Sequence, residues 1–259
     1  MSMYRIGLGF QGIGKPLQGS EVTARGLHGV LYHVLKMGDS SGASWLHHHE
    51  SPKPYNLVPY YAGQNGILAG IRVSALTERS ADLMLHSWEK ARQLGYELRL
   101  GQQSFYVNEI ACIPGTTFEM LSTCPPEPVV GLRFLSPTSF KQGPGHMPLP
   151  VPGNVFSWPF RVWNAYAPAK LRIPTDWLDW CRDDVFIIEH DIETAAVTVS
   201  RKEPPFTGFV GDVWFEAQSK ALLYLSLFQG LANLTAYSGV GHKTTMGMGA
   251  VERIDKQRG

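Results

Sequence analysis

The spacing of apolar positions divides the first half of the chain into elements of a regular order. Weak alternation near the first residues predicts a strand, and apolar residues at helical spacing from Leu27 to Leu35 predict a helix capped by Ser20. The polar stretch after this helix is expected to be a loop. The expected elements are strands at 3–10, 55–61, 67–75 and 103–113 and helices at 20–37 and 80–94. Strand, helix, two strands, helix and strand is the ferredoxin-like order.

The second half begins again after a proline-rich stretch and follows a similar order. STCPPEPVV, residues 122–130, has three prolines in four residues and is the best linker in the chain. The expected elements after it are the strand GLRFLSP, short helices within 153–182, strands near 185–190, 194–200, 206–216 and 247–254, and a helix at about 218–236. The sequence therefore predicts an α+β protein of two tandem ferredoxin-like domains, 1–124 and 125–259, the second with a helical insertion.

Composition narrows the functional classes. The 259 residues carry a net charge of +1, so nucleic-acid binding would need a local basic patch. Three widely spaced cysteines without a CxxC pair argue against a disulfide framework or a cysteine zinc site and favour a reducing cytoplasm. The first residues lack a signal-peptide pattern, and the apolar stretch 221–236 is interrupted by polar residues. We therefore expect a cytoplasmic protein with no membrane partner.

Two glycine-rich segments near the start resemble nucleotide-binding motifs without satisfying them. GLGFQG, residues 7–12, fits GxGxxG, and GFQGIGK, residues 9–15, nearly fits a P-loop. The P-loop needs Ser or Thr after its lysine, where this chain has Pro16. The dinucleotide motif needs a helix that opens within the glycines, which Pro16 and Gly19 oppose. A loop after the first strand is the better interpretation.

A third glycine-rich segment, GVGHKTTMGMG at residues 239–249, follows the last predicted helix and precedes a strand. P-loops have the opposite order, so this segment is no ATP site. It can be a helix-to-strand connector, with Gly239 ending the helix. Four glycines around a cation can instead leave amides and side chains open to phosphate oxygens. The residues expected to bind RNA in that second interpretation are Gly239, Gly241, His242, Lys243, Thr244, Thr245, Gly247 and Gly249.

Helix 218–236, the glycine-rich segment and the following strand resemble the C-terminal signature of the RAMP superfamily. More narrowly, they are similar to the CRISPR-associated endoribonucleases that cut repeat RNA into guide units. The LRFLSPTSF and FTGFVGDVWF strands fall where that family has comparable segments. The resemblance implies two ferredoxin-like domains in tandem, which agrees with the order of elements above. It also implies RNA as the partner of the glycine-rich segment.

The resemblance also implies a catalytic set in the first half. The family uses a histidine between the first helix and the next strand, and that region here reads LYHVLKMGDSSGASWLHHHESPKPY. WLH, the KPY six residues on, and a tyrosine fifteen residues earlier match the family's Tyr/His/Lys arrangement at Tyr32, His47 and Lys53. Because three histidines are adjacent here, His48 and His49 are alternatives to His47 as the catalytic group. Without the resemblance, three adjacent histidines in a loop are more often a solvated stretch or an adventitious metal site.

The implied activity is metal-independent cleavage of CRISPR precursor RNA within its repeats. The 2′-OH attacks the phosphate, which leaves a 2′,3′-cyclic phosphate and a 5′-OH. An imidazole can move either proton, and a cation can stabilise the phosphorane. No metal or cofactor is called for. The alternatives are a non-catalytic RAMP subunit that binds guide RNA in an effector complex, and a phosphoesterase with paired H-x-[ST] motifs, of which only one is present. Effector-complex subunits and a homodimer are left open as further partners.

Overall fold

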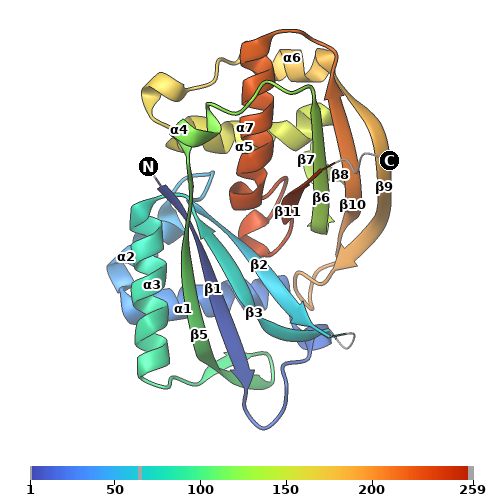
Figure 1. The fold of residues 1–259 in the computed structure, drawn as a ribbon. Helices are drawn as coiled ribbons and strands as arrows, with labels where there is room; N and C mark the ends of the chain where they lie inside the picture. Colours follow the sequence, from blue (N-terminus) through green and yellow to red (C-terminus); the bar gives the residue numbers. More distant parts are fainter. Residues whose placement is uncertain (1, 64–65, 256–259) are drawn as a thin grey trace.

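The computed structural model describes residues 2–63 and 66–255, and it forms two antiparallel sheets, each covered on one face by helices. Figure 1 shows the first half at the lower left and the second half at the upper right. Both halves have the ferredoxin-like strand order, in which the first strand lies between the third and the fourth. The predicted α+β fold of two tandem ferredoxin-like domains is confirmed.

The first sheet has the order β2-β3-β1-β5-β4. Its strands are β1 (Ser2–Gly12), β2 (Tyr55–Ala62), β3 (Ile67–Ala75), β4 (Leu98–Leu100) and β5 (Gln103–Thr117). Strand β1 extends through the GxGxxG segment, so the loop expected there begins only after Gly12. The apolar side chains of β1 and β3 face a core formed with α1 (Ala24–Gly38) and α3 (Glu78–Gln93). The short helix α4 (Phe118–Leu121) ends this half.

The polar stretch after α1 is a helix, which corrects the loop expected from the sequence. Helix α2 (Ser40–His48) begins at Asp39, whose side-chain carboxylate accepts from the backbone amides of Ser41 and Gly42 at 3.0 and 2.9 Å. It buries Ala43 and Leu46 against the first core, and Leu46 is fully buried. This cap and these two apolar residues hold a helix that composition alone does not suggest.

The second sheet has the order β11-β6-β10-β9. Its strands are β6 (Val129–Thr138), β9 (Val185–Val197), β10 (Phe206–Ala217) and β11 (Val251–Ile254), and a separate hairpin pairs β7 (Phe140–Gln142) with β8 (Gly145–Met147). The strands expected at 185–190 and 194–200 are therefore one continuous strand, β9. Helices α5 (Pro152–Tyr166), α6 (Asp176–Asp184) and α7 (Leu222–Ser238) cover one face. Trp163, Trp177 and Trp180 are buried there, as expected for core residues.

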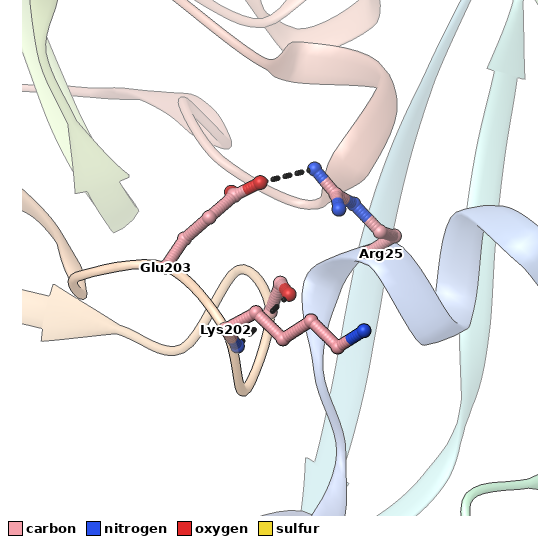
Figure 2. A network of polar contacts seen from close by, with 4 residues as sticks. Arg25, Lys202 and Glu203 are labelled. Carbon is pink, nitrogen blue, oxygen red and sulfur yellow. Dashed lines mark hydrogen bonds and ion pairs between the residues drawn. The ribbon is translucent and has the colours of Figure 1, made fainter.

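The two halves pack against each other at several points. Met3, Leu76, Phe118 and Leu121 belong to the first half but are buried in the core of the second. The turn between β9 and β10 docks on the start of α1, where Ala24 and Arg25 donate backbone hydrogen bonds to the carbonyls of Thr198 and Val199. Figure 2 shows the Arg25–Glu203 ion pair at this contact, 2.6 Å long. We keep residue 124 as the proposed domain boundary.

None of the helices in the described part of the chain has the length and apolar character needed to cross a membrane.

Candidate active site

The ring of Tyr32 lies between two histidines on the surface of the first half. Tyr32 and His28 are one turn apart on α1, and their ring centroids are 4.8 Å apart. The ring of His47, at the end of α2, meets Tyr32 edge to face at 5.3 Å. All three line a hollow of about 460 Å³ with His48, Lys36, Ser40 and Ser44. Three imidazoles and a phenol therefore share one accessible site.

His28 and Tyr32 are both shifted toward their neutral forms. Burial, with smaller effects from the nearby charges of His47 and Lys53, lowers the pKa of His28 below its usual 6.5. Burial raises the pKa of Tyr32 above its usual 10.0, and the hydrogen bond from Tyr55 offsets only part of this effect. A neutral imidazole can accept a proton, and a protonated phenol can donate a hydrogen bond. The sequence analysis gave His28 no role, although its spacing of four residues from Tyr32 on a helix was the available signal.

Lys53 binds the end of the helix that carries His47. Its ammonium group donates to the backbone carbonyl oxygens of Leu46 at 3.0 Å, His47 at 2.6 Å and His49 at 2.5 Å. The last carbonyls of a helix have no partner within it, and a cation at this position also opposes the helix dipole. Burial lowers the pKa of Lys53. Lys53 therefore fixes the last turn of α2 in addition to bringing positive charge to the site.

The two neighbouring histidines are held by other contacts. The His48 ring nitrogen Nδ1 is 2.9 Å from the carbonyl oxygen of Ser44, one turn back on α2. The His49 ring packs on Trp45 and on Tyr166 of α5, and its Nδ1 is 2.7 Å from the carbonyl oxygen of Glu50. His49 therefore points away from Tyr32, toward the second half. Of the three histidines, His47 is the one whose ring contacts Tyr32.

The glycine-rich loop, residues 239–249, packs tightly between the two halves. Its short 3-10 helix η3 (Thr244–Met246) contacts β2 and α1 of the first half. Gly239, Gly241, Gly247 and Gly249 all have positive φ. A Cβ at Gly249 would lie 1.9 Å from the carbonyl oxygen of Val240, and one at Gly241 would lie 2.6 Å from that of Ser139. Close backbone packing thus explains these glycines, a reason that the sequence analysis did not weigh.

Several amides of this loop already have partners within the protein. Val240 donates to the Gly249 carbonyl at 2.8 Å, His242 to that of Ser139 at 3.0 Å, and Gly249 to that of Pro137 at 3.3 Å. Thr244 is 3% exposed. The expected RNA-binding residues therefore divide into two groups. Gly239, Thr244, Gly247 and Gly249 shape the loop, whereas Gly241, His242, Lys243 and Thr245 are partly exposed on its surface.

Lys243 and His242 face an open cleft of about 530 Å³ that also contains Lys53. Lys243 is the only non-glycine residue in the described ranges with positive φ, at 62°. Such strained conformations concentrate at functional sites. The ring of His242 lies 5.3 Å from that of His146 on β8. Burial and the charges of Lys243, His146 and Lys141 lower the pKa of His242.

A chain of hydroxyl groups joins the cleft to the histidine site. Thr245 lines the cleft and hydrogen-bonds to Tyr55, whose hydroxyl donates to that of Tyr32 at 3.5 Å. Lys53 makes a second connection, since it lines the cleft and binds the His47 carbonyl. Lys53 lies in the cleft beside the glycine-rich loop, whereas His47 lies in the neighbouring hollow. Within residues 2–63 and 66–255, no group of three or more His, Cys, Asp or Glu side chains is arranged to hold a metal ion.

Comparison with known proteins agrees with this architecture. The family model of the CRISPR-associated endoribonuclease Cas6 matches residues 132–251. Two solved Cas6 product complexes superimpose over 98% of this chain and all of theirs, with TM-scores of 0.81 and 0.78 at 24% and 25% identity. The first of these proteins is from Thermus thermophilus. The chain is therefore similar to Cas6 endoribonucleases, in sequence over residues 132–251 and in fold over nearly its whole length.

A curated Cas6 endoribonuclease from Streptococcus thermophilus is 26% identical over 126 residues. That match covers 48% of this chain and 50% of the relative, so it spans about half the length of each. A more distant structure, described as a RAMP protein binding different RNA substrates, has 15% identity and a TM-score of 0.58 and shares the fold alone. The Cas6 family model begins in β6, whereas Tyr32, His47 and Lys53 lie before it.

Proposed function

We propose that this protein is a metal-independent endoribonuclease that cuts CRISPR precursor RNA within its repeats. The observation that carries the proposal is the contact of Tyr32 with both His28 and His47 in one open hollow beside a cationic cleft. The match of residues 132–251 to the Cas6 endoribonuclease family model and the similarity to a curated Cas6 endoribonuclease support RNA cleavage as the reaction class. The solved Cas6 product and substrate-mimic complexes, with folds like this one, support RNA as the ligand.

The reaction forms a bond from the 2′ oxygen to phosphorus and breaks the bond from phosphorus to the 5′ oxygen. The 2′-OH gives up its proton to a base, and the departing 5′ oxygen takes a proton from an acid. We assign one of these transfers to His47, because its ring is accessible and held against Tyr32. Tyr32 donates a hydrogen bond to the phosphate or to the leaving oxygen. His28, whose pKa is lowered by burial, is suited to accept the 2′-OH proton, which leaves donation to the 5′ oxygen to His47.

Charge stabilisation comes from the cations beside this site. The phosphorane carries more negative charge than the starting phosphodiester, so nearby fixed cations lower the barrier. Lys53 adds positive charge while it binds the end of α2. Lys243 and His242 of the glycine-rich loop are placed to bind neighbouring phosphates in the cleft. The products are a 2′,3′-cyclic phosphate on one fragment and a 5′-OH on the other.

Cleavage of the host's own repeat RNA in EDTA tests the proposal. The expected result is one cut per repeat at an unchanged rate, with a cyclic phosphate at the new 3′ end. A single deoxy substitution 5′ of the scissile phosphate should abolish cleavage and leave binding nearly intact, because the nucleophile is missing. Loss of cleavage on chelation that magnesium restores would contradict metal independence.

The alternative is a non-catalytic subunit that holds guide RNA in an effector complex. The three hydrogen bonds from Lys53 to the α2 carbonyls favour it in part, because they engage the ammonium group that the catalytic set would present to phosphate. Under that alternative, the protein binds the repeat RNA tightly and leaves it uncut in EDTA and in magnesium alike. Association with effector subunits or with a second copy stays a prediction for either function.

A further inference from the structure

The cationic cleft has a second wall that the sequence analysis assigned no role. One side is the glycine-rich loop, and the other is a face of α5 that carries Asn154, Ser157, Trp158 and Arg161. These positions follow the i, i+3, i+4, i+7 spacing that places residues on one face of a helix. The volume of about 530 Å³ lies in the range of small-ligand sites. The wall therefore presents an amide, a hydroxyl, an indole and a guanidinium to a single ligand-sized space.

The charge of the cleft favours an anion. Lys53, Lys141, Arg161 and Lys243 line it, and none of the described residues that line it is acidic. The whole chain has a net charge of only +1, so this concentration of positive charge is local to the cleft. Phosphate oxygens are the ligands that lysine and arginine side chains bind along a nucleic-acid backbone.

Trp158 adds a fixed aromatic surface beside these cations. Its indole nitrogen donates to the Ser238 carbonyl at the end of α7, 3.2 Å away, which sets the orientation of the ring. The Arg161 guanidinium carbon lies 5.5 Å from the ring centroid. Unlike Trp163 and Trp177, which are fully buried, Trp158 is only partly buried. Unpaired RNA bases stack on aromatic rings and guanidinium planes of this kind.

Asn154, one turn before Trp158 on α5, and Ser157, directly before it, are polar groups that can hydrogen-bond to the edge of a stacked base. The side-chain amide of Asn154 offers both a donor and an acceptor, which suits the hydrogen-bonding edge of a base. The Ser157 hydroxyl donates to the Asn154 carbonyl at 2.9 Å, so its oxygen lone pairs remain as acceptors. The carboxylates of an acidic peptide would pair with the cations, but they would make no contact that requires the Trp158 ring beside the Asn154 amide.

We propose that this cleft binds one unstacked nucleotide of the RNA, adjacent to the scissile phosphate, and selects its base. The proposal rests on the function proposed above. The base stacks on Trp158 and Arg161, Asn154 contacts its edge, and Lys141 and Lys243 bind the flanking phosphates. The nucleotide lies next to the cut because Lys53 lines the cleft and binds the His47 carbonyl, and because Thr245 connects it to Tyr32 through Tyr55.

An abasic scan of a non-cleavable repeat RNA tests the proposal. The probe carries the 2′-deoxy substitution at the cut, and each flanking base is removed in turn. One position should lose about 5- to 150-fold in affinity, the range for one stacked base. Trp158→Ala should lose a similar factor on the intact probe and lose nothing further when that base is removed. Asn154→Ala should bind all four bases at that position alike, whereas the wild type prefers one.

Controls separate the outcomes. Tyr96→Ala removes a partly exposed aromatic ring of the first half and should leave the scan unchanged. Trp158→Phe keeps a stacking ring without the bond to Ser238, and its melting temperature shows whether any loss comes from unfolding. If the wild type binds and cuts the repeat but no abasic position changes its affinity, the nucleotide site is overturned and the proposed function is not. A wild-type protein that binds no RNA overturns both the site and the proposed function. If an acidic peptide displaces the probe equally well from the wild type and from Trp158→Ala, the cleft binds anions without stacking or selecting a base, which overturns the proposal.

Discussion

The ammonium nitrogen of Lys53 lies 2.6 Å from the backbone carbonyl oxygen of His47, so the expected catalytic lysine holds the helix turn that carries the expected catalytic histidine. The family resemblance placed both residues in one catalytic set. The structure adds that Lys53 also binds the carbonyls of Leu46 and His49, which makes it a cap for α2. A lysine in this position can affect cleavage through the orientation of His47 as well as through charge.

Replacing Lys53 should therefore cost stability and rate together. Lys53→Ala removes the cap and is expected to lower the free energy of unfolding by about 1 kcal/mol, the scale of a cation at a helix C-terminus. Because His47 then loses its fixed position, the cleavage rate should fall by at least about tenfold. Thermal unfolding and single-turnover cleavage measure the two effects.

Lys90→Ala is the matched control for Lys53→Ala, because Lys90 donates to the Met37 carbonyl near the end of α1 and does not itself line the catalytic hollow. It should leave the rate unchanged. If Lys53→Ala slows cleavage while its unfolding curve equals that of the wild type, Lys53 acts by charge alone, and its hydrogen bonds to the end of α2 do not add to the stability of the protein.

His47 should carry most of the rate among the three adjacent histidines. His47→Ala is expected to slow cleavage by about 10²–10⁴-fold, the usual loss for one positioned acid or base, with little change in RNA affinity. His48→Ala and His49→Ala should stay near the wild-type rate, since their rings bind Ser44 and Glu50 carbonyls and do not contact Tyr32. Single-turnover rates of the three variants decide this. A dead His49→Ala variant with an active His47→Ala variant would move the site toward Tyr166 and remove the role of Tyr32.

Gly249→Ala should destabilise the protein strongly. Gly249 has φ of 66°, and an added Cβ would lie 1.9 Å from the Val240 carbonyl oxygen. The left-handed conformation and the forced backbone shift together should cost on the order of 3 kcal/mol. Gly29→Ala is the control, because Gly29 is an exposed position of α1 with no atom within 4 Å of an added Cβ. It should stabilise the protein by about 0.5–1 kcal/mol. Urea unfolding of both variants checks the contrast, and equal curves would mean that the loop relaxes freely.

Apolar periodicity was enough to predict the fold, because each half has a sheet with one buried face and helices with one buried stripe. It failed at α2, where only Ala43 and Leu46 are buried apolar residues of the helix and the partly buried Trp45, with serine, glycine and histidine, makes up the rest. The local signal for this helix was Asp39 as an N-cap. It also failed at β9, an edge strand whose mostly exposed residues show little alternation.

The candidate site depends on contacts that no local pattern contains. The pairing of His28 with Tyr32 follows from helix spacing, whereas that of Tyr32 with His47 needed the family resemblance. The reason for the glycines of the loop lies partly in Val240 within the loop and partly in Ser139 and Pro59, which are distant in sequence and close in space. The α5 wall of the cleft lies beside the loop because Trp158 of α5 bonds to Ser238 at the end of α7, where the loop begins. Composition could suggest a phosphate-binding loop, but it could not show which of its residues remain on the surface.

RNA affinity should depend on pH through His242. In the free protein, burial and three neighbouring cationic groups, Lys243, His146 and Lys141, hold the pKa of His242 below 6.5, so the ring is neutral at pH 7. Phosphates that enter the cleft favour the charged imidazole and raise this pKa, so binding takes up a proton. Affinity for the non-cleavable repeat RNA should therefore rise as pH falls from about 8 to about 6, by at most about tenfold per pH unit for one proton. His242→Gln should reduce this dependence, whereas His33→Gln, an exposed change on α1, should keep it. Equal pH dependence in the wild type and in His242→Gln would mean that no phosphate lies beside His242, and the glycine-rich loop would then be a connector that packs the two halves together.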